Sequence, residues 1–231
     1  MLDIRDNLEK VQLAVERACR RSSRKPDDVL VIAVSKTVEI ERIKLSIEAG
    51  VKALGENRVQ EAKDKVAALG RPVPWHLIGS LQTNKAKDAV QLFDWIHSVD
   101  REELARELDR RAHQAERRVK VLVQVNVGLE RQKGGVQPAE LKPLLDAITG
   151  CRNLDVRGLM CIPPATESAE ASRRWFRRLR ELRDAAGLEH CSMGMSSDFE
   201  VAIEEGATMV RVGTAIFGPR APRAAVTEGG A

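Results

Sequence analysis

Short apolar runs alternate with longer amphipathic segments along nearly the whole chain, and this alternation constrains the fold most strongly. Eight such runs end at Val34, Leu54, Ile78, Val99, Val125, Ile162, Met195 and Val212. Each of the first seven precedes a segment in which apolar residues recur at helical spacing. Strands that alternate with helices form parallel sheets, because a helical crossover returns the chain to its starting edge. Eight such units in 231 residues predict an α/β fold, a single (β/α)8 TIM barrel.

Helix boundaries are marked by glycine, proline and capping residues. Five glycines each fall just before a predicted strand, where a left-handed residue can end a helix: Gly50, Gly70, Gly150, Gly187 and Gly206. Asp100 with Glu103, and Ser197 with Glu200, have the spacing of a capping box and predict helix starts. Pro138 suits the first turn of another helix.

The two ends of the chain add features to the predicted barrel. An extra amphipathic helix is expected before the first strand, with its apolar face at Ile4, Leu8, Val11, Val15 and Ala18. A short helix is expected to begin near Thr214, after the last strand. We expect residues 1–220 to form the barrel and 221–231 to form a mobile tail. The alternative is an open doubly wound sheet, although no Gly-x-Gly-x-x-Gly motif follows a strand.

The amino-acid composition indicates which kinds of molecule the protein is expected to bind. The net charge of +4 comes from interleaved charges of both signs, which weakly favours anionic ligands. The arginine-rich segment 173–183 is interpreted as the solvated face of an outer helix, and not as a nucleic-acid surface. Scattered histidines and four cysteines without Cys-x-x-Cys spacing argue against a metal site, and His76 is interpreted as a hydrogen-bonded core histidine. A charged start and the lack of a membrane-spanning run lead us to expect a cytoplasmic protein.

Lys36 lies directly beyond the first predicted strand, with only Ser35 between them. Apolar neighbours partly desolvate its ammonium group, which favours the neutral amine. A neutral lysine amine is the nucleophile that forms Schiff bases with aldehydes. The alternative interpretation is a solvated lysine at the start of a loop.

Other polar residues are expected at the same end of the barrel, because the carboxyl ends of all its strands share one face. Ser196, Gly213 and Thr214 could form a phosphate cradle from backbone amides and hydroxyl groups. The alternative is that the serine caps a helix and the glycine makes a turn. Arg211 lies within the last strand, so its buried charge needs either a ligand or a carboxylate such as Glu56.

Five ordered motifs resemble those of the pyridoxal-phosphate homeostasis proteins, the YggS/PROSC-like family. The motifs are AVSKT at 33–37, GENRVQE at 55–61, HLIGSLQTNK at 76–85, SMGMSSD at 192–198 and TMVRVGTAIFG at 208–218. The resemblance runs from about Leu2 to Arg220. It departs at Arg58, where tyrosine is frequent in the family, and at Ser80, where proline is common.

The resemblance implies a barrel like the N-terminal domain of alanine racemase, with pyridoxal 5′-phosphate bound. The implied cofactor-binding residues are Lys36, Asn57, Ser196, Arg211, Gly213 and Thr214. Lysine would carry the cofactor as an internal aldimine, and the serine, glycine and threonine would hold its phosphate. The arginine would face the pyridine nitrogen, and the asparagine would line the ring.

The cofactor's chemistry favours a carrier over an enzyme. An arginine opposite the ring nitrogen keeps it unprotonated and weakens the electron sink. Racemases of similar fold use a tyrosine from an additional domain as second base, and this chain contains neither. Losing one general acid–base group typically costs roughly 10²–10⁴-fold in rate.

We therefore expect a monomeric protein, not an enzyme, that carries or buffers pyridoxal phosphate for vitamin B6 and amino-acid homeostasis. Its expected partners are the cofactor and pyridoxal-phosphate-dependent apoenzymes, with no nucleic acid, membrane or metal. One alternative is a weak, racemase-like enzyme with Lys36 as its only base. Another is a Schiff-base aldolase that binds a phosphorylated substrate without cofactor.

Overall fold

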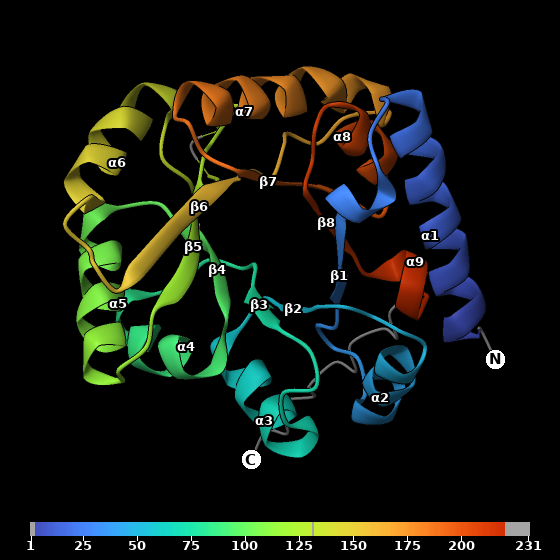
Figure 1. Cartoon of the computed structure of the whole chain (residues 1–231), viewed down its shortest axis with the longest axis horizontal. Coiled ribbons are helices and arrows are strands. Elements are labelled where there is room, and N and C mark those ends of the chain that lie inside the picture. Colours follow the sequence, from blue (N-terminus) through green and yellow to red (C-terminus); the bar gives the residue numbers. More distant parts are fainter. Residues whose placement is uncertain (1–2, 131, 220–231) are drawn as a thin grey trace, which may run out of the picture.

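The chain folds into a closed barrel of parallel strands surrounded by helices, as shown in Figure 1. The computed structural model describes residues 3–130 and 132–219, so the predicted tail at 221–231 lies outside the described residues. Each strand pairs with its neighbour in sequence, and β8 closes the barrel against β1. The strands are β1 (Leu30–Val34), β2 (Leu54–Glu56), β3 (Trp75–Leu77), β4 (Trp95–Val99), β5 (Val119–Gln124), β6 (Leu154–Met160), β7 (His190–Met195) and β8 (Met209–Val212). The predicted (β/α)8 barrel is confirmed.

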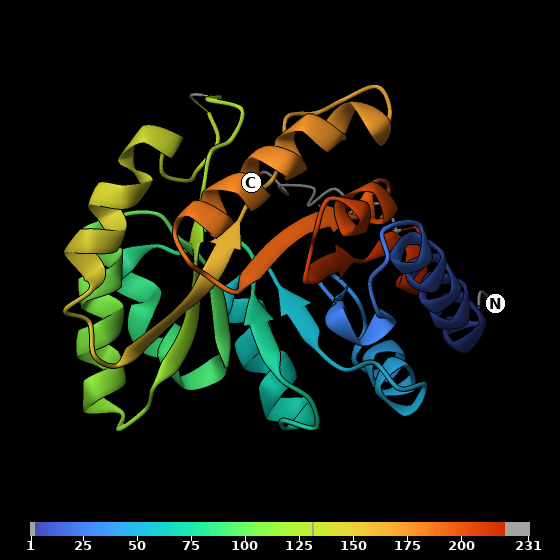
Figure 2. The ribbon, with the colours of Figure 1, turned by 45° about the horizontal axis from the view of Figure 1, so that its top comes forward.

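Helices alternate with these strands and form the outer ring seen in Figures 1 and 2. They are α1 (Ile4–Arg21), α2 (Ile40–Glu48), α3 (Val59–Leu69), α4 (Ala86–Leu92), α5 (Glu102–Gln114), α6 (Leu141–Ile148), α7 (Arg173–Ala185), α8 (Phe199–Glu204) and α9 (Thr214–Phe217). The additional N-terminal helix, α1, lies beside α8 and α9 and buries its predicted apolar face there. The short helix predicted after the last strand is α9, which begins at Thr214.

The core has two layers because strand side chains alternate between the barrel interior and the helices. The inner layer is a small buried cluster of Ile32, Ala53, Trp95, Leu122, Met160 and Met209. The larger, mostly aliphatic layer fills the space between the strands and the helices. Burying such apolar surface stabilises the fold by about 25 cal/mol for each Å² removed from water. All four cysteines are buried free thiols within this framework, as their spacing predicts.

The predicted helix boundaries are only partly correct. Four of the five boundary glycines adopt positive φ values, from +64° to +100°, and Gly150 is the exception. Both predicted capping boxes are wrong, because α5 follows Arg101 and α8 follows Asp198. The Asp100 carboxylate instead accepts a hydrogen bond from the distant Gly135 amide at 3.3 Å, and Asp198 accepts one from the Met195 amide at 2.7 Å. Tertiary and turn contacts therefore outcompete the local capping pattern at both sites.

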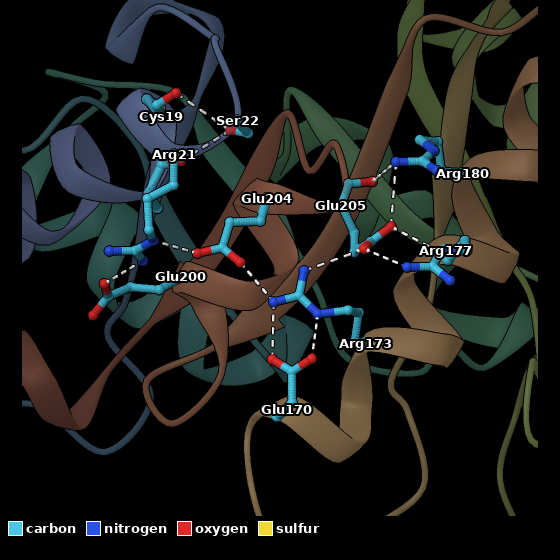
Figure 3. A network of polar contacts seen from close by, with 11 residues as sticks. Cys19, Arg21, Ser22, Glu170, Arg173, Arg177, Arg180, Glu200, Glu204 and Glu205 are labelled. Atoms are coloured by element: carbon cyan, nitrogen blue, oxygen red, sulfur yellow. Dashed lines mark hydrogen bonds and ion pairs between the residues drawn. The ribbon is translucent and has the colours of Figure 1, made fainter.

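The arginine-rich helix α7 uses several of its charges to bind acidic residues at α8 (Figure 3). Arg173 contacts both Glu204 and Glu205, at 2.6 and 3.2 Å. Arg21 of α1 contacts Glu204 from the other side, at 2.5 Å. The network therefore joins α1, α8 and α7, as expected for an outer helix. Glu205 is buried and Arg173 and Glu204 are half-buried, so the attraction within these pairs is offset by the cost of removing their charges from water. The network fixes the relative positions of the three helices.

Within residues 3–130 and 132–219, no helix is long and apolar enough to cross a membrane. The same described residues contain no group of three or more histidine, cysteine or acidic side chains placed to hold a metal ion.

Candidate functional site

A pocket of about 310 Å³ lies at the carboxyl-terminal ends of the barrel strands. Its lining residues come from the ends of several strands: Val34, Lys36, Asn57, Ile78, Ile162, Met195, Ser196, Ser197, Arg211, Gly213 and Thr214. All six residues predicted to bind cofactor are therefore brought together around one pocket. Its size falls at the lower end of the range for small-molecule sites, roughly 300–1,000 Å³. The two departures from the family motifs, Arg58 and Ser80, are exposed and are not among the lining residues.

Lys36 reaches the pocket because of the alternation of side chains along β1. Ile32 belongs to the inner barrel cluster, and Val34 lines the pocket above it. Lys36 continues the same face two residues later and lines the pocket as well. The apolar stem of this lysine therefore enters an environment formed partly by aliphatic side chains.

Ser196 and Gly213 follow the neighbouring strands β7 and β8 and contact each other directly at the mouth of the barrel. The Gly213 amide donates a hydrogen bond to the Ser196 hydroxyl at 3.2 Å. Neither serine after β7 serves as the predicted helix cap, since the residue that precedes α8 is Asp198. A Cβ atom at position 213 would lie 3.4 Å from the backbone oxygen and Cβ of Val34, which is an ordinary van der Waals contact, so packing does not require glycine here. Thr214 follows as the first residue of α9.

Asn57 is held in place by a close approach between two strand ends. A Cβ atom on Gly79 would lie only 2.2 Å from the backbone oxygen of Asn57. No real contact is that short, so only glycine allows the segment after β3 to pass this close. The position of Asn57 at the pocket therefore depends on a residue that does not itself line it.

Arg211 is buried on the inner side of β8, with 4% of its surface exposed. Its guanidinium donates hydrogen bonds to the Ser192 hydroxyl and to the Cys161 backbone oxygen, both at 2.8 Å. Within the described residues, no carboxylate forms an ion pair with it, and the alternative partner Glu56 is paired with Lys65 instead. Burial lowers the pKa of Arg211, but guanidinium groups stay charged in proteins. The pocket floor therefore carries a positive charge that favours an anionic ligand.

A chain of hydrogen bonds continues from Arg211 through the barrel interior. Ser192 contacts the His97 Nδ1 atom at 3.0 Å, and the His97 Nε2 atom contacts the His76 Nδ1 atom at 2.9 Å. Because arginine can only donate, Ser192 accepts from it and is free to donate to His97. His97 then donates to His76, which keeps its own proton on Nε2. This assignment leaves one buried group unpaired, the His76 Nε2 atom, whereas the reverse direction would leave the serine proton unpaired too.

The interpretation of His76 as a hydrogen-bonded core histidine is confirmed, whereas sequence reasoning missed the roles of His97 and Ser192. Both are polar residues inside otherwise apolar strands, and this pattern is the feature of the sequence that could have identified them. Nothing in their spacing predicted mutual contact, because Ser192 and His97 are 95 residues apart.

Stability should fall in mild acid because of these buried histidines. Burial lowers the pKa of His76 from 6.5 to about 3, so the unfolded chain binds a proton there at pH values where the folded protein does not. Its contribution is fully present above pH 6.5 and is lost as the pH falls toward 3. At pH 5 the loss should be about 2 kcal/mol, since each pH unit below the unfolded pKa contributes about 1.4 kcal/mol. Urea unfolding at pH 8 and pH 5 measures this loss. The variant His76→Gln should show a smaller difference in the free energy of unfolding between the two pH values. An unchanged difference in that variant would contradict the prediction.

Comparison with known proteins supports these structural findings. The sequence family described as "Alanine racemase, N-terminal domain" matches residues 7–221. The pyridoxal phosphate homeostasis protein of Aquifex aeolicus is 46% identical over 222 residues, covering 93% of this chain and 97% of the relative. The protein of the same name from Escherichia coli K12 is 41% identical over 232 residues, covering 95% and 98%.

Solved structures agree in fold. The structure of PipY from Synechococcus elongatus, solved with PLP bound, has a TM-score of 0.78 and 40% identity, covering 89% of this chain and all of that one. Alanine racemase from Clostridium difficile, at 16% identity and a TM-score of 0.69, shares the fold over 96% of this chain and 58% of its own. From the identity and coverage of these relatives, the chain belongs to the pyridoxal phosphate homeostasis protein family.

Proposed function

We propose that this protein binds pyridoxal 5′-phosphate reversibly and holds it as a carrier or buffer, without strong catalysis. The observation that carries the proposal is the convergence of an amine, a serine–glycine cradle and a buried guanidinium around one pocket; among the described residues, no carboxylate pairs with that guanidinium. Family membership and the PLP-bound relative PipY support the same ligand.

The residues of the pocket fit the chemical groups of this cofactor. The Lys36 amine would attack the aldehyde carbon, and the aldehyde oxygen would leave as water when the carbon–nitrogen double bond forms. Ser196, Gly213 and Thr214 would bind the phosphate through hydroxyl and amide donors. Arg211 would donate toward the pyridine nitrogen. The aliphatic lining residues Val34, Ile78 and Ile162, with Met195, would cover the apolar faces of the ring.

The residues around the pocket favour binding of the cofactor over catalysis with it. Pyridoxal phosphate, when bound, supplies an electron sink for carbanions at an amino acid. The Arg211 side chain can donate a hydrogen bond but cannot deliver a proton at neutral pH, so it leaves the ring nitrogen unprotonated. The 231 residues contain no tyrosine that could act as a second base. The covalent bond would form with release of one water molecule, so water alone could break it again. Hydrolysis of this bond would therefore release the cofactor to an apoenzyme.

Absorbance of the purified protein, recorded before and after borohydride reduction, tests the proposal. We expect a visible band that reduction removes, and an adduct that peptide mapping places on Lys36. A preparation without such a band would favour an aldolase that uses no cofactor. Stereospecific turnover of an amino acid at ordinary enzyme rates would contradict the carrier function.

A further inference from the structure

The residues on both sides of Lys36 are held by one ionic cluster that lies outside the pocket. This cluster, Glu56, Glu61 and Lys65, joins the end of β2 to α3. None of its three members lines the pocket. Glu56 and Lys65 are buried, with 0% and 5% of their surfaces exposed.

Lys65 binds three oxygen atoms at once. Its ammonium contacts Glu56 and Glu61 at 2.7 Å each, and it donates to the Ser35 backbone oxygen at 2.6 Å. An ammonium group has three protons, so these contacts use its full donor capacity. Ser35 is held a second time, because its hydroxyl donates to the Glu56 carboxylate at 2.6 Å. The residue before Lys36 is therefore fixed through its backbone and its side chain.

The residue after Lys36 is fixed in a strained conformation. Thr37 has a φ of +61°, in the left-handed region that β-branched residues strongly avoid. Its amide donates a hydrogen bond to the Glu61 carboxylate at 2.5 Å. Such strain persists only where surrounding contacts hold it, and it is concentrated at functional sites. Glu61, itself held by Lys65, supplies the contact that holds this turn.

Stability alone does not account for the cluster. Burying an ion pair costs desolvation energy that often exceeds the attraction between its charges. One carboxylate oxygen of Glu56 is buried without a hydrogen-bond partner, which adds to that cost. All three hydrogen bonds described beyond the ion pairs are made with the two residues that flank Lys36. The arrangement is therefore better suited to fixing the backbone there than to stabilising the fold.

We propose that Glu56, Glu61 and Lys65 are positioning residues for Lys36. By fixing Ser35 and imposing the left-handed turn at Thr37, they direct the lysine amine into the pocket. The cluster thereby sets how tightly the protein retains an aldehyde. The proposal rests on the proposed function, because it assigns Lys36 as the attachment point.

Thr37→Pro tests the turn, because proline cannot adopt positive φ and lacks the amide that donates to Glu61. We expect binding of pyridoxal phosphate, followed by absorbance titration, to weaken at least about tenfold. The matched control is Glu116→Pro, at an exposed residue with φ of +52° between α5 and β5, whose amide donates to the His113 backbone oxygen. Both variants remove a left-handed turn and one hydrogen bond from a backbone amide, so their unfolding midpoints should fall similarly, and only Thr37→Pro should lose affinity. Equal binding by Thr37→Pro and the parent would overturn the proposal.

A second pair of variants tests the Glu61 contact. Glu61→Leu removes the acceptor for the Thr37 amide, whereas the amide oxygen of Glu61→Gln can still accept that bond. We expect Glu61→Leu to bind pyridoxal phosphate at least about tenfold more weakly, with most of the affinity retained in Glu61→Gln. If the leucine variant does not fold, the comparison of Thr37→Pro with Glu116→Pro still decides. Equal weakening in both Glu61 variants would contradict the role of this contact.

Borohydride reduction separates failure of this proposal from failure of the proposed function. With the proposed function correct, the parent and every variant that binds should carry the reduced adduct on Lys36. An adduct on Lys36 together with unchanged affinities in all variants would overturn only the positioning role. A parent protein without that adduct would overturn both.

Discussion

Lys36→Ala should abolish the borohydride-reducible visible band and weaken retention of pyridoxal phosphate by at least about 100-fold. The variant keeps the serine–glycine cradle and Arg211, so the proposed non-covalent contacts with the phosphate and ring remain. It loses the one lysine among the described residues that line the pocket, and with it the proposed covalent bond that would convert a weak complex into a retained one. A 100-fold loss corresponds to about 2.8 kcal/mol of binding free energy. Equilibrium dialysis and absorbance spectra of the two proteins measure these effects.

The control for this prediction is Lys44→Ala on α2. Lys44 is an exposed lysine whose ammonium contacts Glu41 at 2.9 Å, away from the pocket lining. Its replacement should leave both the band and the retention unchanged. Survival of the visible band in Lys36→Ala would show that another amine captures the cofactor, and the proposed function would then need a different attachment site.

Arg211→Gln should weaken retention of pyridoxal phosphate by roughly 10- to 100-fold and shift the visible absorption band. A hydrogen bond that involves a charged group contributes about 1.5–3 kcal/mol, which corresponds to that range. Glutamine also leaves the Ser192 hydroxyl and the Cys161 oxygen with fewer donors, so the unfolding midpoint should fall as well. The band shift is the specific readout, because loss of stability alone would not change the spectrum of bound cofactor.

Arg180→Gln provides the comparison for the arginine. Arg180 is on α7, and its guanidinium contacts Glu205 at 3.2 Å in the outer ion-pair network. Its replacement should change neither the band nor the affinity. If Arg211→Gln also retains the parental spectrum and affinity, the Arg211 guanidinium of the parent protein does not face the pyridine ring.

The sequence predicted the barrel well because the signal is repeated along the chain. Eight apolar runs, the additional first helix and the short last helix all correspond to elements of the structure. At Asp100 the predicted capping box fails because the carboxylate accepts a hydrogen bond from the Gly135 amide, 35 residues away. Local spacing carries no information about which distant group will reach the same carboxylate. At α8 the failure is local, because Asp198 precedes the helix and accepts from the Met195 amide.

The site was predicted less completely than the fold. Motif resemblance selected six residues, and the folded chain places all of them around one pocket. The hydrogen-bonded chain from Arg211 to His76 was not predicted, because barrel closure brings together strands that are far apart in sequence. Glu56 was considered as a partner for Arg211, but alternation turns it outward toward Lys65. The left-handed Thr37 had no sequence signal, since threonine gives no reason to expect positive φ.

Barrel closure also determines when the pocket can come into existence during synthesis. The first strand completes its pairing only with the last, as Leu30 to Ala33 align with Met209 to Val212. The glycine and threonine of the proposed phosphate cradle are synthesised about 180 residues after the lysine. A nascent chain therefore offers an amine without the cradle until β8 has been made. Capture of the vitamin must follow synthesis of β8, and a chain truncated before that strand cannot assemble the pocket.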